Sequence, residues 1–379
     1  MQKIARLSSI DMLRGFVIAL MALDHTRDFF GPAPFNPEDL AATTPAWFWT
    51  RWITHLCATV FVLLAGSSAF LREQGSGTAA LSRYLATRGA MLLVLEATWI
   101  SFSWQFGFNA IIFQVIWALG AGMIILALLV WLPRPAIGVI AALLIVPHNA
   151  LDAIQSKTLL WQAWHQGGFY PLPEGSGLDG LVFIYPLMPW VGLIAAGYAL
   201  GPVFLWDRER RARFLLACAG VLLLAFVALR AFNLYGDPDP WSPQGRGLMF
   251  DLMSFFRVHK YPPSLLYLCI TCSIGLALLV LFERIRSNKV LLLFGCSPLF
   301  FYVVHVSLIH FLGNLYFDLR FGRGLEFING AASWPDGYTP SLAVVYAAWV
   351  VMLGLMYGLT LLWQRYPKTR QLRGAAIVQ

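Results

Sequence analysis

The chain has 379 residues, of which 59% are hydrophobic, 15% aromatic and only 12% charged. A soluble domain of this length cannot hide that much apolar surface, so the composition excludes most soluble classes and indicates a polytopic membrane protein. The formal net charge of +8 requires no nucleic-acid partner, because an excess of Lys and Arg in cytoplasmic loops explains it.

The apolar segments are continuous and do not alternate with period two, so they predict membrane-spanning helices and not barrel strands. We therefore expect an all-α polytopic bundle that forms a single domain over residues 1–379. Ten segments reach roughly the length of a span. In chain order they are about 9–29, 52–71, 84–103, 110–131, 135–150, 182–205, 212–232, 262–282, 291–313 and 341–364.

Lys and Arg residues are unevenly divided between the two sets of connecting segments. They are dense before the first span, between the sixth and seventh spans, between the eighth and ninth, and after the tenth. Positive loops stay in the cytoplasm, so both termini are predicted to be cytoplasmic and the end of the first span is predicted to face outward.

The end of the first span holds four charged or titratable side chains in five positions: Asp24, His25, Arg27 and Asp28. Residues three and four apart share a helix face, so His25 is expected to lie over Asp28, with Asp24 also beside Asp28. A carboxylate next to an imidazole raises its basicity and fixes its tautomer, as a general base requires. The alternative is an interfacial cap with an Asp24–Arg27 salt bridge.

Further ionisable residues occur in other spans, where such groups suggest function. His55 begins the second span at the outer face, where it can meet His25, and His305 lies in the ninth span. Taken alone, each of these histidines is more often a hydrogen-bonded core residue than a catalyst. Glu96, inside the third span, also needs a buried partner.

At the cytoplasmic end, Asp11 and Arg14 are three residues apart and can neutralise each other. Alternatively, Arg14 can join Arg72 or Arg88 in binding phosphates. From Arg14 to His25 the helix rises roughly 16 Å, a gap that a long, thin cofactor could span.

The five Cys residues fall in apolar spans, where thiols act as small hydrophobes, so we expect neither a disulfide framework nor a metal site. Two GxxxG pairs, Gly197/Gly201 and Gly354/Gly358, indicate close helix contacts within a protomer or in a homodimer. The long outer loops are rich in Trp and Tyr, which could stack on a sugar or form an interfacial aromatic belt.

Several motifs resemble the catalytic domain of the heparan-α-glucosaminide N-acetyltransferase family, in particular its bacterial homologues. The motifs are Arg6-Leu-Ser-Ser-Ile-Asp-Met-Leu-Arg-Gly15, Phe61-Val-Leu-Leu-Ala-Gly-Ser-Ser68, Tyr185-Pro-Leu-Met-Pro-Trp-Val-Gly192, Lys260-Tyr-Pro-Pro-Ser-Leu-Leu266 and Pro298-Leu-Phe-Phe-Tyr302. The resemblance implies a transmembrane acetyltransferase of a bacterial inner membrane. Acetyl-CoA would bind from the cytoplasm, and the acetyl group would pass to a glucosamine amine on the far side.

The sequence departs from this family at the expected catalytic positions. The lysosomal enzyme has an asparagine at the end of its first helix and a histidine in the loop that follows. Here Asp24 takes the asparagine position, His25 follows it directly, and residues 31–50 contain no His. His55 stands where relatives of the lysosomal enzyme carry an acidic residue.

Together these observations predict acetyl transfer to an amine or hydroxyl of an extracytoplasmic sugar or glycan. His25 would be the general base, supported by Asp28 or Asp24, while His55 would orient the acceptor or stabilise the oxyanion. The resemblance and the charge pattern assign Arg14, Arg72 and Arg88 to acetyl-CoA and Lys260, Tyr261 and His305 to the acceptor. Two alternatives remain: a proton-coupled transporter or flippase for a sugar or lipid, and a b-type haem protein.

Overall fold

The computed structural model describes residues 7–324 and 334–366. In these residues seven helices are long and apolar enough to cross a membrane, and two shorter apolar helices accompany them. The all-α polytopic class is therefore confirmed. The lysines and arginines at the two termini, on which part of the orientation argument depends, lie outside the described residues.

Helices connected by short turns account for most of the described chain. The α-helices are α1 (Ser8–Phe30), α2 (Pro45–Ile53), α3 (Leu56–Ser76), α4 (Thr78–Leu95), α5 (Ser101–Gln105), α6 (Val115–Leu129), α7 (Arg134–Ile145), α8 (Leu159–Trp161), α9 (Leu187–Leu200), α10 (Arg208–Ala231), α11 (Leu248–Phe256), α12 (Leu265–Arg284), α13 (Lys289–Gly295), α14 (Pro298–Phe321) and α15 (Leu342–Arg365). Short 3₁₀ or π-helical pieces are η1 (Glu96–Ile100), η2 (His148–Leu151), η3 (Gln162–Gln166) and η4 (Gly201–Leu205).

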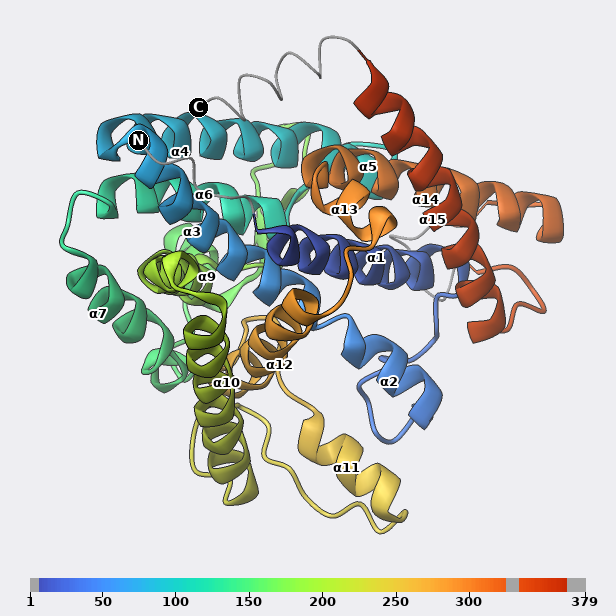
Figure 1. Ribbon diagram of the computed structural model, residues 1–379. Helices are drawn as coiled ribbons and strands as arrows, with labels where there is room; N and C mark the ends of the chain where they lie inside the picture. Colours follow the sequence, from blue (N-terminus) through green and yellow to red (C-terminus); the bar gives the residue numbers. More distant parts are fainter. Residues whose placement is uncertain (1–6, 325–333, 367–379) are drawn as a thin grey trace.

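Helix α1 occupies the centre of the bundle and packs against α3, α12, α13, α14 and α15 (Figure 1). Most of its residues are buried, including charged ones such as Asp11 and Arg27. Backbone contact with α13 is very close, because a Cβ atom on Gly15 or Gly295 would collide with main-chain atoms of the other helix. The central position explains why most of α1, including charged side chains, is buried among other helices.

A small three-stranded sheet joins the predicted outer loop at 151–181 to the starts of the fourth and sixth predicted spans. Strand β3 (Gly180–Phe183) is central, pairing in parallel with β1 (Ala110–Phe113) and antiparallel with β2 (Gly168–Pro171). The fourth and sixth predicted spans were therefore too long at their starts, because their first residues pair as strands before α6 and α9 begin. Apolar β-branched and aromatic residues occur both in membrane-spanning helices and in strands, so the sequence alone does not distinguish the two. The pairing between strands decides it.

Helix boundaries also differ from the sequence prediction later in the chain. The ninth span is broken at Cys296–Ser297, where Pro298 opens α14 at a position that needs no backbone N–H, and α13 becomes a separate helix. The loop at 233–261 contains α11, which its Gly-Pro-rich start did not predict.

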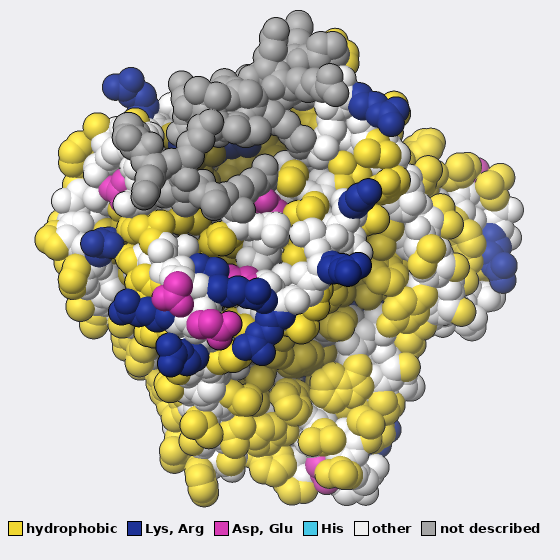
Figure 2. Space-filling view, viewed as in Figure 1, with side chains coloured by type: hydrophobic (Ala, Val, Ile, Leu, Met, Phe, Trp, Pro, Cys, Tyr) yellow, Lys and Arg dark blue, Asp and Glu magenta, His cyan; other side chains and the backbone are white. Residues whose placement is uncertain are grey.

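The two GxxxG pairs have different surroundings. Gly197 and Gly201 of the α9–η4 segment press against Leu63 and Phe70 of α3, so this pair serves packing within the protomer. Gly354 and Gly358 on α15 have no atom within 4 Å of an added Cβ. Figure 2 shows a surface that is largely hydrophobic, with charged side chains gathered in limited regions, as expected for a protein embedded in lipid.

Candidate functional site

The charged residues at the end of α1 form a buried ion-pair network. Asp24 is its centre: its carboxylate contacts Arg51 of α2 at 2.8 Å, Arg27 at 3.0 Å and the Lys260 ammonium at 3.9 Å. Arg27 also contacts Asp28 at 2.7 Å. The Asp24–Arg27 salt bridge expected as the alternative reading of this stretch is therefore present.

Glu38, from the loop between α1 and α2, completes the network and was missed in the sequence analysis. Its carboxylate lies 2.7 Å from Nε2 of His55 and 3.9 Å from Nε of Arg51. Burial raises the pKa of Glu38, but His55 and Arg51 outweigh this and hold that pKa well below its usual value of 4.5. Glu38 and its neighbour Asp39 are both acidic residues in a polar loop, and the sequence does not indicate which of them joins the network.

We expect the Glu38→Gln variant to unfold at a lower temperature, because the amide removes the charged partner of His55 and Arg51. A hydrogen bond to a charged group is worth about 1.5–3 kcal/mol. The pKa of Glu38 is lowered by folding, so its contribution is present above pH 4.5 and is lost as pH falls towards the folded-state pKa. Thermal denaturation in detergent at pH 7 and pH 4 measures this; an equal difference between variant and native protein at both values would contradict the assignment.

His25 contacts His305 of α14. It contacts neither Asp28, which the helix spacing suggested, nor His55, which was expected at the same depth on the next span. Nδ1 of His25 lies 2.9 Å from Nε2 of His305, with the two rings nearly parallel. The expectation of an Asp28 partner was wrong because Asp28 turns towards Arg27. The expectation of a His55 partner was wrong because His55 is held by Glu38 and packs on Tyr267.

The hydrogen bonds of His305 fix the tautomers of both rings. Nδ1 of His305 lies 2.9 Å and 2.8 Å from the backbone oxygens of Phe301 and Tyr302, which can only accept, so this nitrogen carries the hydrogen. Nε2 of a neutral His305 then has a lone pair, and Nδ1–H of His25 donates to it. The remaining nitrogen of His25, Nε2, is therefore unprotonated, which is the form that a general base requires.

Exposure distinguishes the three histidines. His25 keeps 9% of its surface accessible, whereas His55 and His305 are completely buried. Trp104 of α5 packs edge-on against the His25 ring at 5.0 Å and shields one side of it. Of the three rings, only His25 has accessible surface through which a substrate could reach it.

Lys260 and Tyr261, predicted to bind the acceptor, lie beside this network. The Lys260 side chain is buried against Asp24, while Tyr261 is 36% exposed and its hydroxyl lies 3.5 Å from that of Tyr185. Although burial alone raises the pKa of Tyr261, the nearby Lys260 and Arg51 charges lower it overall. Tyr261 is thus the member of this pair with surface available to a ligand.

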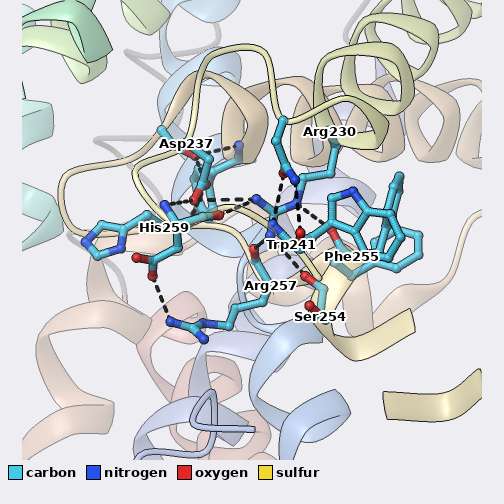
Figure 3. Close-up of polar contacts among 12 residues, drawn as sticks. Arg230, Asp237, Trp241, Ser254, Phe255, Arg257 and His259 are labelled. Carbon is cyan, nitrogen blue, oxygen red and sulfur yellow. Dashed lines mark hydrogen bonds and ion pairs between the residues drawn. The ribbon is translucent and has the colours of Figure 1, made fainter. Parts of the chain in front are cut away.

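The segment that carries Lys260 is anchored by a second buried arginine, Arg230 of α10 (Figure 3). Its guanidinium donates to the backbone oxygens of Asp239, Ser254, Phe255 and Arg257. Nearby, Asp237 accepts hydrogen bonds from the His259 backbone N–H and the Ser264 hydroxyl. These bonds tie the segment before α12 to α10, and Lys260 of this segment lies against Asp24.

Of the three arginines assigned to acetyl-CoA, Arg14 lies near the start of α1, Arg72 near the end of α3, and Arg88 within α4, which packs on α3. Arg14 contacts Asp11 at 3.1 Å, as expected for mutual neutralisation, and also donates to the Ser68 hydroxyl at 3.0 Å. Arg72, one turn after Ser68 on α3, stacks on the ring of Tyr84 of α4. Arg88 lies one turn after Tyr84. Arg14, Arg72 and Arg88 thus lie on three helices, α1, α3 and α4.

These features define a polytopic helical membrane protein with a histidine–carboxylate site at one end of its central helix and arginines at the other. A family model described as heparan-alpha-glucosaminide N-acetyltransferase, catalytic, matches residues 6–234. The chain therefore belongs to this family, which makes it a transmembrane acetyltransferase. A comparison with curated protein sequences finds no match.

The family match includes only part of the candidate site. His25, the ion-pair residues of α1 and α2, and the three arginines fall inside residues 6–234. Lys260, Tyr261 and His305 lie beyond it: the first two are in the segment before α12, and His305 is on α14. In the described residues, no group of three or more His, Cys, Asp or Glu side chains could hold a metal ion.

Proposed function

We propose that the protein transfers an acetyl group from cytoplasmic acetyl-CoA to an amine or hydroxyl of an extracytoplasmic sugar or glycan, in a bacterial inner membrane. The observation that supports this most strongly is the His25–His305 pair, which leaves an unprotonated nitrogen on His25, the member of the pair that keeps accessible surface. A base of this kind is what acyl transfer from a thioester to a weakly acidic N–H or O–H group needs.

In the proposed reaction, Nε2 of His25 accepts a proton from the acceptor as its nitrogen or oxygen attacks the thioester carbonyl carbon. The carbon–sulfur bond then breaks, and the thiolate of CoA leaves and takes up that proton. Asp24, the residue directly before His25, stabilises the imidazolium electrostatically. His305 keeps the His25 ring in its reactive tautomer. His25 could also carry the acetyl group transiently; the same nitrogen serves in both routes.

At the other end, Arg14, Arg72 and Arg88 are proposed to bind the phosphates of acetyl-CoA, for which guanidinium groups are well suited. The roughly 16 Å between Arg14 and His25 along α1 suits a donor whose phosphates stay at one end while its extended arm reaches the other. His55, held by Glu38, and Lys260, held by Asp24, are assigned to keeping the network in place.

The proposal predicts that His305 acts through His25. We expect His305→Leu to lower kcat strongly, because the Nδ1–H of His25 loses its acceptor and the tautomer is no longer fixed. His305→Gln, whose amide oxygen can accept the same hydrogen bond, is expected to recover much of kcat. Equal activity of the two variants in a steady-state assay, with unchanged KM values, would contradict this positioning role.

The function itself is tested by incubating detergent-purified protein with acetyl-CoA and glucosamine or simple glycans, and measuring CoA release and acetylated sugar. We expect both products in equal amounts. If the protein neither binds nor consumes acetyl-CoA, the acetyltransferase proposal fails, and transport of a sugar or lipid becomes the account to test.

A further inference from the structure

An open cavity of about 440 Å³ lies beside the last turn of α1. Its volume falls in the range of small-molecule sites. One wall is formed by Arg27 and Asp28, a second by the proline-rich segment 31–37, and a third by Trp334, which precedes α15. No residue of this cavity except Asp28 was among the site residues predicted from the sequence.

We infer that this cavity binds the acceptor as a saccharide ring, with one face on Trp334 and its hydroxyl or ammonium groups on Asp28. This inference rests on the proposed function. It moves acceptor binding away from Lys260, whose side chain is buried and paired with Asp24.

Exposure within the cavity supports Asp28 as the polar contact. The Asp28 side chain is 24% exposed, compared with 10% for Arg27, which is engaged by both Asp24 and Asp28. A carboxylate accepts hydrogen bonds from O–H and N–H groups alike. Trp334 is half-buried and offers a large, rigid apolar surface of the kind on which the C–H face of a sugar packs.

His25 does not line the cavity, but both lie at the same end of α1. Asp28 follows His25 by three residues, so the two side chains lie on neighbouring parts of the helix surface, roughly 4.5 Å apart along the axis. His25 keeps its accessible surface at this end of α1. A ring held between Asp28 and Trp334 would therefore lie at the same end of α1 as His25.

The net charge of the side chains around the cavity favours neither neutral sugars nor amino sugars. Asp24, Asp28 and Glu38 are balanced by Arg27, Arg51 and Lys260 in one network. Recognition therefore depends on hydrogen bonds and stacking. Glucose and glucosamine both offer a C–H face and hydroxyl groups, but only glucosamine has an ammonium group. Comparing their binding therefore distinguishes recognition of a hydroxyl from recognition of an ammonium.

The test is calorimetric titration of glucose and glucosamine into the detergent-purified full chain, a measurement that does not depend on acetyl-CoA. We expect Trp334→Ala to weaken saccharide binding roughly fivefold to tenfold, because stacking is lost, and Trp334→Phe to retain most of it. Trp131→Ala, which removes an exposed tryptophan at the opposite end of the bundle, is the matched control and should bind as the native chain does.

Asp28→Asn identifies the polar contact. Weaker binding of glucosamine alone indicates an ammonium on Asp28, and weaker binding of both sugars indicates hydroxyl contacts; either supports the cavity. No saccharide binding by the native chain, or binding that Trp334→Ala and Asp28→Asn leave unchanged, would overturn it. Because acetyl-CoA turnover is measured separately, sugar binding without turnover would count against the proposed function and not against the cavity.

Discussion

Replacing His25 with alanine should lower kcat for acetyl transfer by about 10²–10⁴-fold, the usual contribution of a positioned general base. Binding of acetyl-CoA should change little, because the arginines proposed to hold it lie at the other end of α1. The protein should remain folded, since the His25 ring is linked by one hydrogen bond, to His305. Steady-state kinetics with radiolabelled acetyl-CoA, together with a separate binding measurement, checks both expectations.

His310→Ala is the matched control for this variant. His310 is also a buried histidine that packs on Phe29 of α1, and its Nδ1 faces a backbone oxygen, that of Ser103. It has no contact with the ion-pair network in the described part of the chain. If His25→Ala kept native kcat, or if His310→Ala lost as much activity as His25→Ala, the assignment of the base would be wrong.

Replacing Asp24 with alanine should have the largest effect on stability. The change leaves Arg27, Arg51 and Lys260 close together without their shared carboxylate. Removing one partner of a buried ion pair typically costs about 3–5 kcal/mol. We expect little folded protein in the membrane fraction and a clearly lower thermal denaturation midpoint for any that is recovered.

Asp24→Asn separates this structural effect from a catalytic one. The amide oxygen can still accept a hydrogen bond from Arg51, so this variant should fold more readily while losing the negative charge beside His25. We therefore expect a clear fall in kcat with only a small fall in the thermal denaturation midpoint. Glu174→Ala, at an exposed carboxylate, serves as the control for removing a charge. A native-like melting temperature for Asp24→Ala would show that the network does not depend on Asp24.

The fold class could be predicted from composition, because 59% hydrophobic residues in continuous segments leave few alternatives to a membrane bundle. Contacts between neighbours on one helix could also be predicted: the Asp24–Arg27 and Asp11–Arg14 pairs both occur at three-residue spacing. The starts of α6 and α9 could not be predicted, because they depend on the pairing of β1 with β3, two segments about 70 residues apart in the chain.

The partner of His25 could not be read from the sequence. The rules of helix spacing favoured Asp28, but His305 lies 280 residues away and reaches His25 only because α14 packs on α1. Glu38 was missed for a similar reason, since its loop becomes ordered around Arg51 and His55 only in the folded protein. Where each side chain finds its charge partner is decided by tertiary packing.

The central claim is that one protein takes an acetyl group from one side of the membrane and delivers it to an acceptor on the other. The most direct test uses proteoliposomes with the saccharide acceptor trapped inside and acetyl-CoA added only outside. We predict acetylated saccharide in the lumen and free CoA outside, both absent with His25→Ala. Acetylated product that forms only when donor and acceptor share a compartment would contradict the account.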